Sequence, residues 1–540
     1  MSTARELIRQ GNKKEIWQKH CGFIDFSVDE FVETQSHLLL EQLRLVGDCE
    51  LGHKLLWGTK PSSVEEFRQN VPLTTYRDYF PYLPEKREDA LPEKPILWQR
   101  TSGRSGEYPC KWVPVTERLY KEVGFYVVAM LAFSSAKRRG QFIIRDHDKL
   151  LYGLAPPPYA SGAMGGLLDD EFSFDVMPPK DKAEQMDFIE RIREGYSLAL
   201  TEGLDVVFSI SSIMVAIGEQ FSQGASTSLS SMRSRPRAAP RLAKALVKSK
   251  LAGRPPLPRD VWNLKSLLTA GMDTSILREK LKHYWGRYPF EMYASTEMLM
   301  AALQTWDYKD MIFVPTIGFY EFISEEEHQK AKMYRSYRPR TLLLNEVEAG
   351  QRYEIVFTSL QGGPFVRYRI GDWLEITALR NEELNINLPQ VTFYGRCDDI
   401  LDIGGFTRLT EKTLWQAIEN SGVGYNGWTV RKEVNGSEPI LHIYIELKRQ
   451  GKTAEEAKIA VHQSLKEINT DWADLEQMLG WQPLEVTLLP EGAFGRYMLE
   501  KQAAGADLAH LKPPQMNASD DTIENLLRIP LSKAGGGSEY

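Results

Sequence analysis

The sequence is poor in cysteine, and its few cysteines show no pattern. Four are spread over 540 residues, at Cys21, Cys49, Cys110 and Cys397. Zinc sites need ligands a few residues apart, and small secreted domains need dense cysteine pairs, so neither class is indicated. This cysteine usage suits a reducing compartment, and we expect a cytoplasmic protein.

The sequence also lacks a long apolar segment. Its longest apolar run, Phe125 to Phe133, is about half the length that a helix needs to cross a bilayer. The N-terminal segment MSTARELIRQGNKKEIWQKH is charged throughout and has neither the apolar stretch nor the small-residue cleavage site of a signal peptide. We therefore expect a protein that is neither secreted nor membrane-spanning.

Charge of one sign is not in large excess either. The formal net charge is -7 at pH 7, which gives no bulk attraction to nucleic acid or to an anionic membrane. Residues 224–259 are locally basic and contain no Asp or Glu, but such a segment is more often a solvated helical surface than a polyanion site. We expect small-molecule partners, and neither nucleic acid nor a membrane.

The composition is that of a globular protein. Apolar residues make up 42% and charged residues 26% of the chain, and this length ordinarily divides into roughly two to four compact units. Residues 1–95 have helical spacing, and after Trp98 short apolar runs such as Phe142–Ile144, Val206–Ile210 and Leu264–Leu268 alternate with helical patterns, which predicts an α/β fold.

The predicted fold has two domains. Strand-like runs follow Pro315, and beyond Gly395 a new unit begins with the helical pattern LTEKTLWQAIEN. We expect a large N-terminal domain over residues 1–397, with β-sheets flanked by helices, a small mobile α+β domain over residues 398–533, and a disordered tail over residues 534–540.

A segment rich in glycine and hydroxyl groups follows the first apolar stretch of the α/β region. TSGRSGEYPCK runs from Thr101 to Lys111 and places hydroxyl side chains between two glycines. Backbone N–H groups and hydroxyls in such a loop can bind a phosphate, and Lys111 would add positive charge. An ordinary polar turn has the same composition, so both interpretations stay open. The spacing is not that of a Walker loop or of a nucleophile elbow.

A second segment combines an aromatic ring, two hydroxyls and a carboxylate. It reads YASTE from Tyr293 to Glu297, after a short strand pattern and before an apolar, helix-like run. The ring could stack on a base, and oxygens of Thr296 and Glu297 could bind Mg²⁺. A Ser-Thr-Glu sequence before an apolar run is also typical of a helix N-terminus.

Two later segments carry polar groups beside predicted strands. In YRIGD, Asp372 ends a strand and could accept hydrogen bonds from both hydroxyls of a ribose, although Gly-Asp turns are frequent. In FYGRCDDILDIGGFTRLTE, Arg396 could bind an anionic nucleotide, and the acidic, glycine-rich stretch after it could serve as a hinge.

The order of these segments along the chain is more specific than any one of them. It resembles the adenylate-forming enzymes, the superfamily of acyl-CoA synthetases, peptide-synthetase adenylation domains and luciferases. Within that superfamily the sequence resembles the Gretchen Hagen family of acyl acid amido synthetases. The closer resemblance spans nearly the whole chain and is carried by WNLKSLLTAG, FVPTIGFYEFI, LLLNEVEAGQRYEIVFTSLQGGPFVRYRIGDWLEIT and FGRYMLEKQAAGADLAHLKPP.

The resemblance implies ATP and Mg²⁺ as cofactors and assigns roles to residues. Asp372 would hold the ribose, Arg396 would bind the nucleotide, and Asp398 would be the hinge. Lys512 would reach the α-phosphate and the substrate carboxylate, although Lys501 lies close to it in sequence. Lys512, Glu297 and Arg396 would be catalytic, with Thr296 and Glu297 as metal ligands. The implied residues for the phosphates and the adenine are Thr101, Ser102, Gly103, Ser105, Gly106, Tyr293, Ala294, Ser295 and Thr296.

The resemblance also implies an activity. The enzyme would activate a small carboxylic acid with ATP to an acyl-adenylate, releasing pyrophosphate, and then transfer the acyl group to an amine or amino acid to give an amide and AMP. We place the acyl pocket between the strand ending near Ser209–Ser212 and a glycine-rich loop over Tyr152–Gly166, and expect a monomer or weak dimer. The alternatives are an acyl-CoA ligase, a carrier-loading adenylating enzyme and a catalytically silent nucleotide-binding scaffold.

Overall fold

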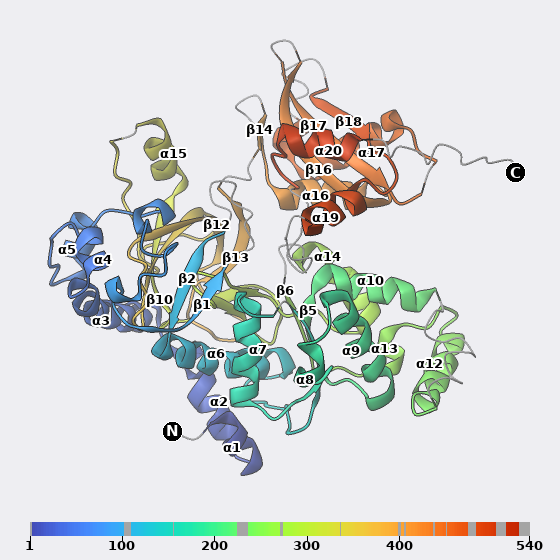
Figure 1. Cartoon of the computed structure of the whole chain (residues 1–540), viewed down its shortest axis with the longest axis horizontal. Coiled ribbons are helices and arrows are strands. Elements are labelled where there is room, and N and C mark those ends of the chain that lie inside the picture. The colour runs from blue at the N-terminus through green and yellow to red at the C-terminus, as the bar shows by residue number, and fades with distance from the viewer. Residues whose placement is uncertain are drawn as a thin grey trace, which may run out of the picture. The chain divides into compact units, whose positions relative to one another are not determined.

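The computed structural model in Figure 1 describes most of the chain, and two compact units, Met1–Tyr394 and Gly395–Tyr540, can be distinguished in it. The predicted boundary lies a few residues later, between residues 397 and 398. The predicted tail lies outside the described residues. The described ranges are 3–101, 110–154, 156–223, 236–270, 274–334, 336–397, 401–403, 407–435, 438–449, 451–473, 482–503 and 515–528.

The first unit begins with helices, as the spacing of residues 1–95 predicts. Several of them start at a hydroxyl side chain that accepts a hydrogen bond from a free N–H group of the first turn, as Thr3 and Ser27 do. The elements of this region are α1 (Ala4–Arg9), α2 (Lys13–Cys21), η1 (Gly22–Asp25), α3 (Val28–Gly47), α4 (Glu50–Leu55), α5 (Val64–Asn70), η2 (Tyr76–Tyr79) and η3 (Glu88–Ala90).

A seven-stranded sheet organises the main core of the first unit. Its strand order is β10-β11-β12-β13-β9-β8-β7, and a separate hairpin is formed by β1 (Pro95–Arg100) and β2 (Trp112–Thr116). The sheet strands are β7 (Met292–Tyr293), β8 (Ala302–Gln304), β9 (Met311–Phe313), β10 (Gly318–Ser324), β11 (Arg352–Ser359), β12 (Tyr368–Ala378) and β13 (Gln390–Arg396), and α15 (Glu325–Met333) follows β10.

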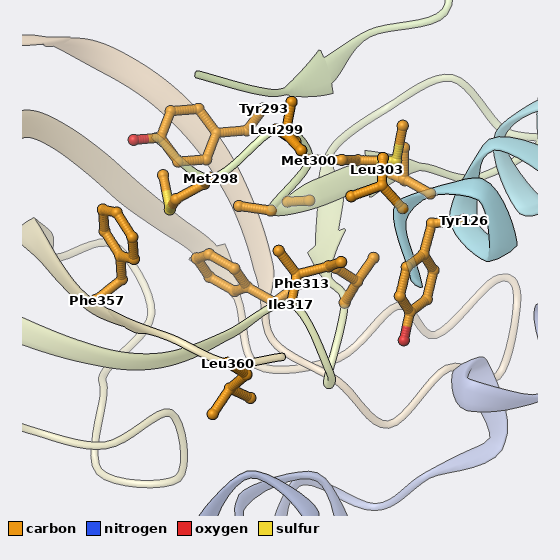
Figure 2. Close-up of a cluster of buried hydrophobic side chains, with 14 of the residues drawn as sticks. Tyr126, Tyr293, Met298, Leu299, Met300, Leu303, Phe313, Ile317, Phe357 and Leu360 are labelled. Atoms are coloured by element: carbon orange, nitrogen blue, oxygen red, sulfur yellow. The ribbon is translucent and has the colours of Figure 1, made fainter. Parts of the chain in front are cut away.

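The apolar side chains of this sheet close over a buried cluster. Figure 2 shows Phe313 and Ile317 beside Met298, with Tyr293 and Tyr126 in the same cluster. Burial of this apolar surface is the main stabilising contribution, at roughly 25 cal/mol per Å². The turn that carries YASTE is thus anchored in the core.

A second sheet of the first unit is parallel, with the strand order β4-β3-β5-β6. Two of the predicted apolar runs lie in it, because Val206–Ile210 is β5 and Leu264–Leu268 overlaps β6. The strands are β3 (Lys149–Gly153), β4 (Asp175–Met177), β5 (Val206–Ile210) and β6 (Ser266–Ala270). The helices are α6 (Glu117–Ser135), α7 (Ala160–Glu171), α8 (Lys180–Ala183), α9 (Phe188–Glu202), α10 (Ser211–Ser222), α12 (Ala239–Leu251), α13 (Pro258–Val261) and α14 (Thr274–Trp285).

The run Phe142–Ile144 was predicted as a strand, and this prediction is wrong. Phe142 and Ile144 are buried in the core, but among the described residues the segment pairs with no strand, and the strand begins later, at Lys149. Three residues of alternating burial are too few to separate a strand from an extended connection.

The second unit contains a three-stranded sheet with the order β16-β17-β18, a small hairpin of β14 and β15, and helices. The patterns LTEKTLWQAIEN (409–420) and TAEEAKIAVHQSLKEI (453–468) predict helices, and the patterns LHIYIELK (441–448) and LEVTLL (484–489) predict strands. All four are present, whereas no such pattern predicts β16. The elements are β14 (Leu401–Ile403), β15 (Thr407–Leu409), α16 (Glu411–Asn420), β16 (Tyr425–Asn435), β17 (Glu438–Leu447), α17 (Ala454–Ile468), β18 (Leu484–Leu488), α19 (Ala493–Ala503) and α20 (Asp520–Leu527).

The arrangement of both units confirms the predicted α/β class, with sheets flanked by helices in the large unit and an α+β arrangement in the small one. In the part of the chain that the structure describes, no helix combines the length and the apolar character needed to cross a bilayer.

Candidate nucleotide and acyl site

The YASTE segment ends β7 and begins the connection to β8 in a hairpin. Tyr293 ends β7 and pairs with Ala302, and the N–H of Ala301 donates to the Tyr293 carbonyl at 2.8 Å. Within the turn, the Ser295 hydroxyl accepts a hydrogen bond from the Met298 N–H at 3.1 Å. The backbone of Leu299 has a φ of 60°, in the left-handed region.

The predicted helix after YASTE is therefore absent. Met298 and Leu299 are buried in the core of the first unit, as Figure 2 shows, and the next residues enter β8. The apolar run fills the core as part of a hairpin, and pairing with β7 outweighs its local helical preference. The turn leaves Ala294 exposed, Ser295 and Thr296 half-buried, and Glu297 buried.

Glu297 forms an ion pair with Lys111. The Lys111 Nζ lies 3.8 Å from the Glu297 Oε1, and the side chains are only 13% and 6% exposed. The same ammonium donates to the Tyr368 hydroxyl at 3.3 Å and lies 5.5 Å from the centroid of the Tyr76 ring. At this depth a pair is screened less than a surface pair, so its charges remain available to a charged ligand.

The same lysine closes the base of the hydroxyl-rich loop. The Thr101 N–H donates to the Lys111 carbonyl at 2.9 Å, and the Lys111 N–H donates to the Thr101 hydroxyl at 2.9 Å. The loop joins β1 to β2, in which Arg100 pairs with Trp112. The structure places the base of this loop, Thr101 and Lys111, beside Glu297. The predicted phosphate-binding residues within the loop lie outside the described residues: Ser102, Gly103, Ser105 and Gly106.

The third predicted segment meets the second through Asp372. The Tyr293 hydroxyl donates to the Asp372 Oδ2 at 2.7 Å, and Asp372 is buried. The Tyr293 ring also stacks on Phe393, with centroids 6.1 Å apart and an angle of 25° between the ring planes. Residues separated by many positions in the sequence thus lie around one aromatic ring.

A backbone irregularity positions Asp372, which lies inside β12 and not at the end of a strand as predicted. Between the pairs Val356↔Arg369 and Glu354↔Trp373 the register of β11 and β12 shifts, because β12 contains extra residues there. Gly371, within this bulge, has a φ of 81°, a conformation that glycine adopts without a steric penalty. A bulge re-aims the side chains next to it, and here it brings the Asp372 carboxylate to Tyr293.

The end of the parallel sheet provides a second part of the candidate site. The connection after β3 leads to β4 on one side, and the connection after β5 leads to β6 on the other, so β3 and β5 are neighbours whose chains leave in opposite directions. Ligands of open α/β sheets bind outside the carboxyl ends of strands at such a switch point. Gly153 and Ser209 stand opposite each other there, and the Ser209 hydroxyl donates to the Gly153 carbonyl at 3.2 Å.

The predicted glycine-rich loop over Tyr152–Gly166 is only partly a loop, because α7 begins at Ala160. The glycines serve close packing of this helix. A Cβ at Gly162 would lie 2.1 Å from the Pro157 nitrogen, and a Cβ at Gly165 would lie 3.2 Å from the Tyr152 ring. Composition alone does not separate a glycine that permits a turn from one that permits close contact.

Arg100 links the two parts of the candidate site. Its N–H donates to the Pro158 carbonyl at 3.0 Å, and its Nη2 donates to the Tyr159 hydroxyl at 2.7 Å. Arg100 immediately precedes Thr101, and Tyr159 immediately precedes α7. The base of the hydroxyl-rich loop therefore adjoins the segment that follows β3.

The remaining predicted residues lie in the second unit. Arg396 is the last residue of β13 and is half-buried. Asp398 and Lys512 lie outside the described residues. Lys501 is exposed on α19, and its ammonium is 5.4 Å from the centroid of the Tyr497 ring.

Sequence reasoning missed Tyr368 and Phe393, which contact Lys111 and Tyr293. Both are aromatic residues at strand positions, where a core role is the ordinary expectation. Tyr368 stands four positions before Asp372 in the predicted motif, and this proximity was the one available signal.

Comparison with known domains agrees with this arrangement. Three domain descriptions match the chain in order: the GH3 family N-terminal domain at residues 22–152, the GH3 family central domain at residues 311–396 and the GH3 family C-terminal domain at residues 412–521. Together they cover more than half of the chain.

Curated relatives are similar over part of their length. An indole-3-acetic acid-amido synthetase, GH3.15 of Arabidopsis thaliana, is 26% identical over 230 residues, which are 39% of this chain and 37% of that protein. A jasmonoyl-L-amino acid synthetase, GH3.5 of Oryza sativa subsp. japonica, is 24% identical over 293 residues, which are 51% of this chain and 49% of that protein. The matches span less than half the length of each relative.

A solved structure shares the fold over nearly the whole chain. The AtGH3.15 acyl acid amido synthetase in complex with 2,4-DB aligns with a TM-score of 0.63 and 17% identity, over 92% of this chain and 93% of that one. The shared fold and the three domain matches, in the same order along the sequence, confirm the resemblance that the motifs indicated: the chain belongs to the GH3 family.

Proposed function

We propose that this protein uses ATP to activate a small carboxylic acid as an acyl-adenylate and then transfers the acyl group to the amino group of an amino acid. The observation that carries the proposal is the Lys111–Glu297 pair, at which the base of the hydroxyl-rich loop meets the YASTE turn. Asp372 is joined to the same turn through Tyr293. Membership of the GH3 family supports this assignment.

The first step answers a chemical difficulty. A carboxylate does not react with an amine, because the group that would leave is oxide. In the proposed reaction a carboxylate oxygen attacks the α-phosphorus of ATP, a new O–P bond forms, and the bond to pyrophosphate breaks with its electron pair leaving on pyrophosphate. The acyl group is then bonded to AMP, a far better leaving group.

Residues of the first unit provide the charges for this step. We assign the phosphates to the Thr101–Gly106 loop and Lys111, the ribose to Asp372, and the adenine to the region of Tyr293. Positive charge close to the phosphates stabilises the charge that develops as pyrophosphate leaves. The Lys111 ammonium is already held beside Glu297 and Tyr368, so little reorganisation is needed when ATP binds.

The YASTE turn also fits Mg²⁺. Glu297 and Thr296 offer a carboxylate and a hydroxyl oxygen, and Mg²⁺ prefers oxygen ligands of this kind. The Thr296 side chain is half-buried and that of Glu297 is buried, in one turn. When bound, the ion would neutralise charge on the phosphates.

The second step requires a different set of groups around the acyl carbon. The amine nitrogen attacks that carbon, the bond to the AMP oxygen breaks, and the nitrogen loses a proton as the amide forms. We propose that the small domain rotates about Asp398 between the steps, and that Lys512 acts in the first and not the second. Lys501 is the alternative lysine.

The test is carboxylate-dependent exchange of pyrophosphate into ATP by the full-length protein, across aromatic, aliphatic and amino acids. We expect exchange with a limited set of acids, its loss in Lys512→Ala and its retention in Lys501→Ala. A folded, ATP-binding protein that exchanges with no acid would refute adenylation. The reverse result for the two lysines would reassign the catalytic lysine and leave adenylation intact.

The acceptor is tested separately, because an acyl-CoA ligase or a carrier-loading enzyme would share the first step. Incubation with ATP, the active acid and a mixture of amino acids and coenzyme A should yield the amide. A thioester as the main product would contradict the proposed amine acceptor. The curated relatives carry names with two different acids, so neither acid is assigned to this chain.

A further inference from the structure

The first unit contains a cleft that the proposed reaction does not use. Its volume is about 690 Å³, and it lies among α5, the segment after α15 and the start of β12. We call it the arginine cleft, and define it by Trp57, Arg68, Tyr337, Arg338, Arg340 and Thr341, which line it with other residues. This volume is within the range of small-molecule sites, which is about 300 to 1,000 Å³.

Three arginines of the cleft are already paired with carboxylates. The Arg367 Nη2 lies 2.8 Å from Glu321, the Arg369 Nη2 lies 2.7 Å from Glu354, and the Arg68 Nη2 lies 3.1 Å from Glu346. These pairs fix the walls of the cleft. Burial acts to raise the pKa of Glu354, but the hydrogen bonds that its carboxylate accepts from His328 and Arg369 outweigh burial and lower the pKa, which keeps this wall charged.

Arg338 and Arg340 differ from these three. Both side chains are exposed, and within the part of the chain that the structure describes no carboxylate pairs with either guanidinium. The Arg340 N–H donates to Glu327 at 2.7 Å, which holds the backbone of the segment without using the side chain. The cleft therefore presents two guanidinium groups whose charges are available.

Aromatic surface is exposed beside these charges. The Trp57 side chain is 66% exposed, and its backbone has a φ of 52°, where a bulky residue is uncommon. The Arg338 guanidinium lies 5.5 Å from the centroid of the Trp57 ring. Tyr337 is 36% exposed, and its hydroxyl donates to Glu327 at 2.9 Å. An exposed ring beside a cation is a surface on which a planar group can stack.

The arginine cleft lies on the other face of β12 from the candidate nucleotide site. Successive residues of a strand point to opposite faces. Tyr368 contacts Lys111, whereas its neighbour Arg369 lines the cleft. The two sites therefore share a strand and no side chain.

We propose that the arginine cleft binds a small organic anion with an aromatic ring. Arg338 and Arg340 bind the oxyanion, because guanidinium donors match both carboxylate and phosphate oxygens. The Trp57 ring stacks on the ring of the ligand. The source of the charge is either a carboxylate or a phosphate, and the experiment separates them. The inference does not depend on the proposed adenylation.

The test is calorimetric titration of the full-length protein with 1-naphthoate, AMP and inorganic phosphate. The variant is Arg338→Gln with Arg340→Gln, and the matched control is Lys332→Gln, an exposed cation on α15 that does not line the cleft. Naphthoate and AMP can also bind outside the cleft, for example at the candidate nucleotide and acyl site. The difference in binding between the double variant and the control therefore isolates the cleft. Thermal unfolding first establishes that all three proteins are folded alike.

We expect the double variant to lose about tenfold or more in affinity for at least one ring-bearing probe at one class of binding sites. The control should bind every probe with the affinity of the wild type. Loss confined to naphthoate identifies a carboxylate ligand, and loss confined to AMP identifies a phosphate ligand. Identical titrations of all three proteins with every probe overturn the proposal.

Trp57→Asn tests the aromatic half of the proposal, because asparagine tolerates the left-handed backbone at this position. We expect weaker binding of the ring-bearing probe and unchanged binding of inorganic phosphate. Unchanged binding of both would overturn the role of the ring.

Discussion

At the residue scale, Lys111 is the point at which the separate motifs of the first unit meet. Its backbone closes the hydroxyl-rich loop against Thr101, and its side chain lies 3.8 Å from Glu297. Each side chain of this buried pair holds the other in place, and their opposite charges compensate each other. In the reaction we propose, the lysine faces the phosphates of ATP and the carboxylate faces Mg²⁺.

The first prediction concerns this pair. Glu297→Gln preserves the size of the side chain but removes the charge, so we expect acid-dependent pyrophosphate exchange to fall by roughly two to three orders of magnitude, as when one transition-state contact is removed. Lys121→Gln, an exposed lysine on α6, is the control and should exchange like the wild type. Exchange by a folded Glu297→Gln protein at the wild-type rate would contradict the role of Glu297.

The second prediction concerns a carboxylate of the second unit. Burial acts to raise the pKa of Glu433, but hydrogen bonds from His442, Tyr444 and Arg431 outweigh it and lower the pKa to about 2. The folded-state pKa is below the unfolded value of about 4.3, so this stabilisation is present at higher pH and is lost as the pH falls from about 5 towards 2.

We therefore expect Glu433→Gln to lower the free energy of unfolding by about 1 to 3 kcal/mol at pH 7. The difference from the wild type should shrink as the pH falls, in urea titrations at several pH values. Glu485→Gln on β18 removes a more exposed ion pair with Lys458 and should change stability by less than about 0.5 kcal/mol. A Glu433→Gln deficit that does not change with pH would show that the carboxylate charge is not its source.

At this scale the sequence predicted the residue types but not all contacts. Tyr293 was singled out as a ring that could stack on a base and Asp372 as a carboxylate that could hold a ribose, and the structure joins them by a hydrogen bond. Phe393 and Tyr368 were not, because an aromatic residue in a strand has the same pattern whether it lies in a core or beside a ligand. Such contacts depend on which strands become neighbours, and no local pattern encodes that.

At the element scale, the bulge of β12 determines where Asp372 points. Gly371 adopts a φ of 81°, which an alanine reaches only with a penalty of about 1 to 2 kcal/mol. The chain accepts an interrupted ladder at this position, and the extra residues turn the carboxylate to the Tyr293 hydroxyl.

The third prediction follows from the bulge. Gly371→Ala should lower the free energy of unfolding by about 1 to 2 kcal/mol, measured by urea denaturation, and should raise the KM for ATP because Asp372 is displaced. Gly350→Ala, at a φ of 77° with open space around it, carries the same backbone penalty far from the motif in sequence and is the matched control. An equal change in KM for both variants would mean that strain in general, and not the bulge, affects ATP binding.

Elements whose apolar residues repeat with a clear helical or strand period were predictable from the sequence. Elements whose structure depends on contacts with other parts of the chain were not. The helix at 453–468 has a capping box at Thr453 and a clear apolar stripe, and it forms as α17. The run after YASTE has the same apolar character but is short, and it completes a hairpin instead. The glycines before Glu171 indicated a loop, although they allow α7 to pack closely. In each failure a tertiary contact outweighed a weak local preference.

At the scale of the whole molecule, the division of the chain suits the proposed reaction, which has two different steps. The segments that carry Thr101, Glu297 and Asp372 all belong to the first unit, whereas Arg396, Asp398 and Lys512 belong to the second. The sequence predicts two domains, because the pattern of helices and strands starts anew beyond Gly395. The three GH3 domain matches extend across both units.

The last prediction addresses this division. If the small domain rotates about Asp398 between adenylation and acyl transfer, a residue that fixes the backbone there should affect only one of the two steps. Proline locks φ near -65°, so Asp398→Pro should hold the chain in one arrangement. We expect pyrophosphate exchange to stay within about twofold of the wild type, while amide formation from the same acid falls by roughly tenfold or more.

The control for this experiment is Asp398→Ala, which removes the carboxylate but leaves the backbone free. It should retain both half-reactions, because the proposal requires a change of backbone angles at this position and not a charge. Equal losses of amide formation in the alanine and proline variants would assign a side-chain role to Asp398. A proline variant that performs both steps at the wild-type rate would place the hinge elsewhere, and rotation about Asp398 would no longer explain the two proposed steps.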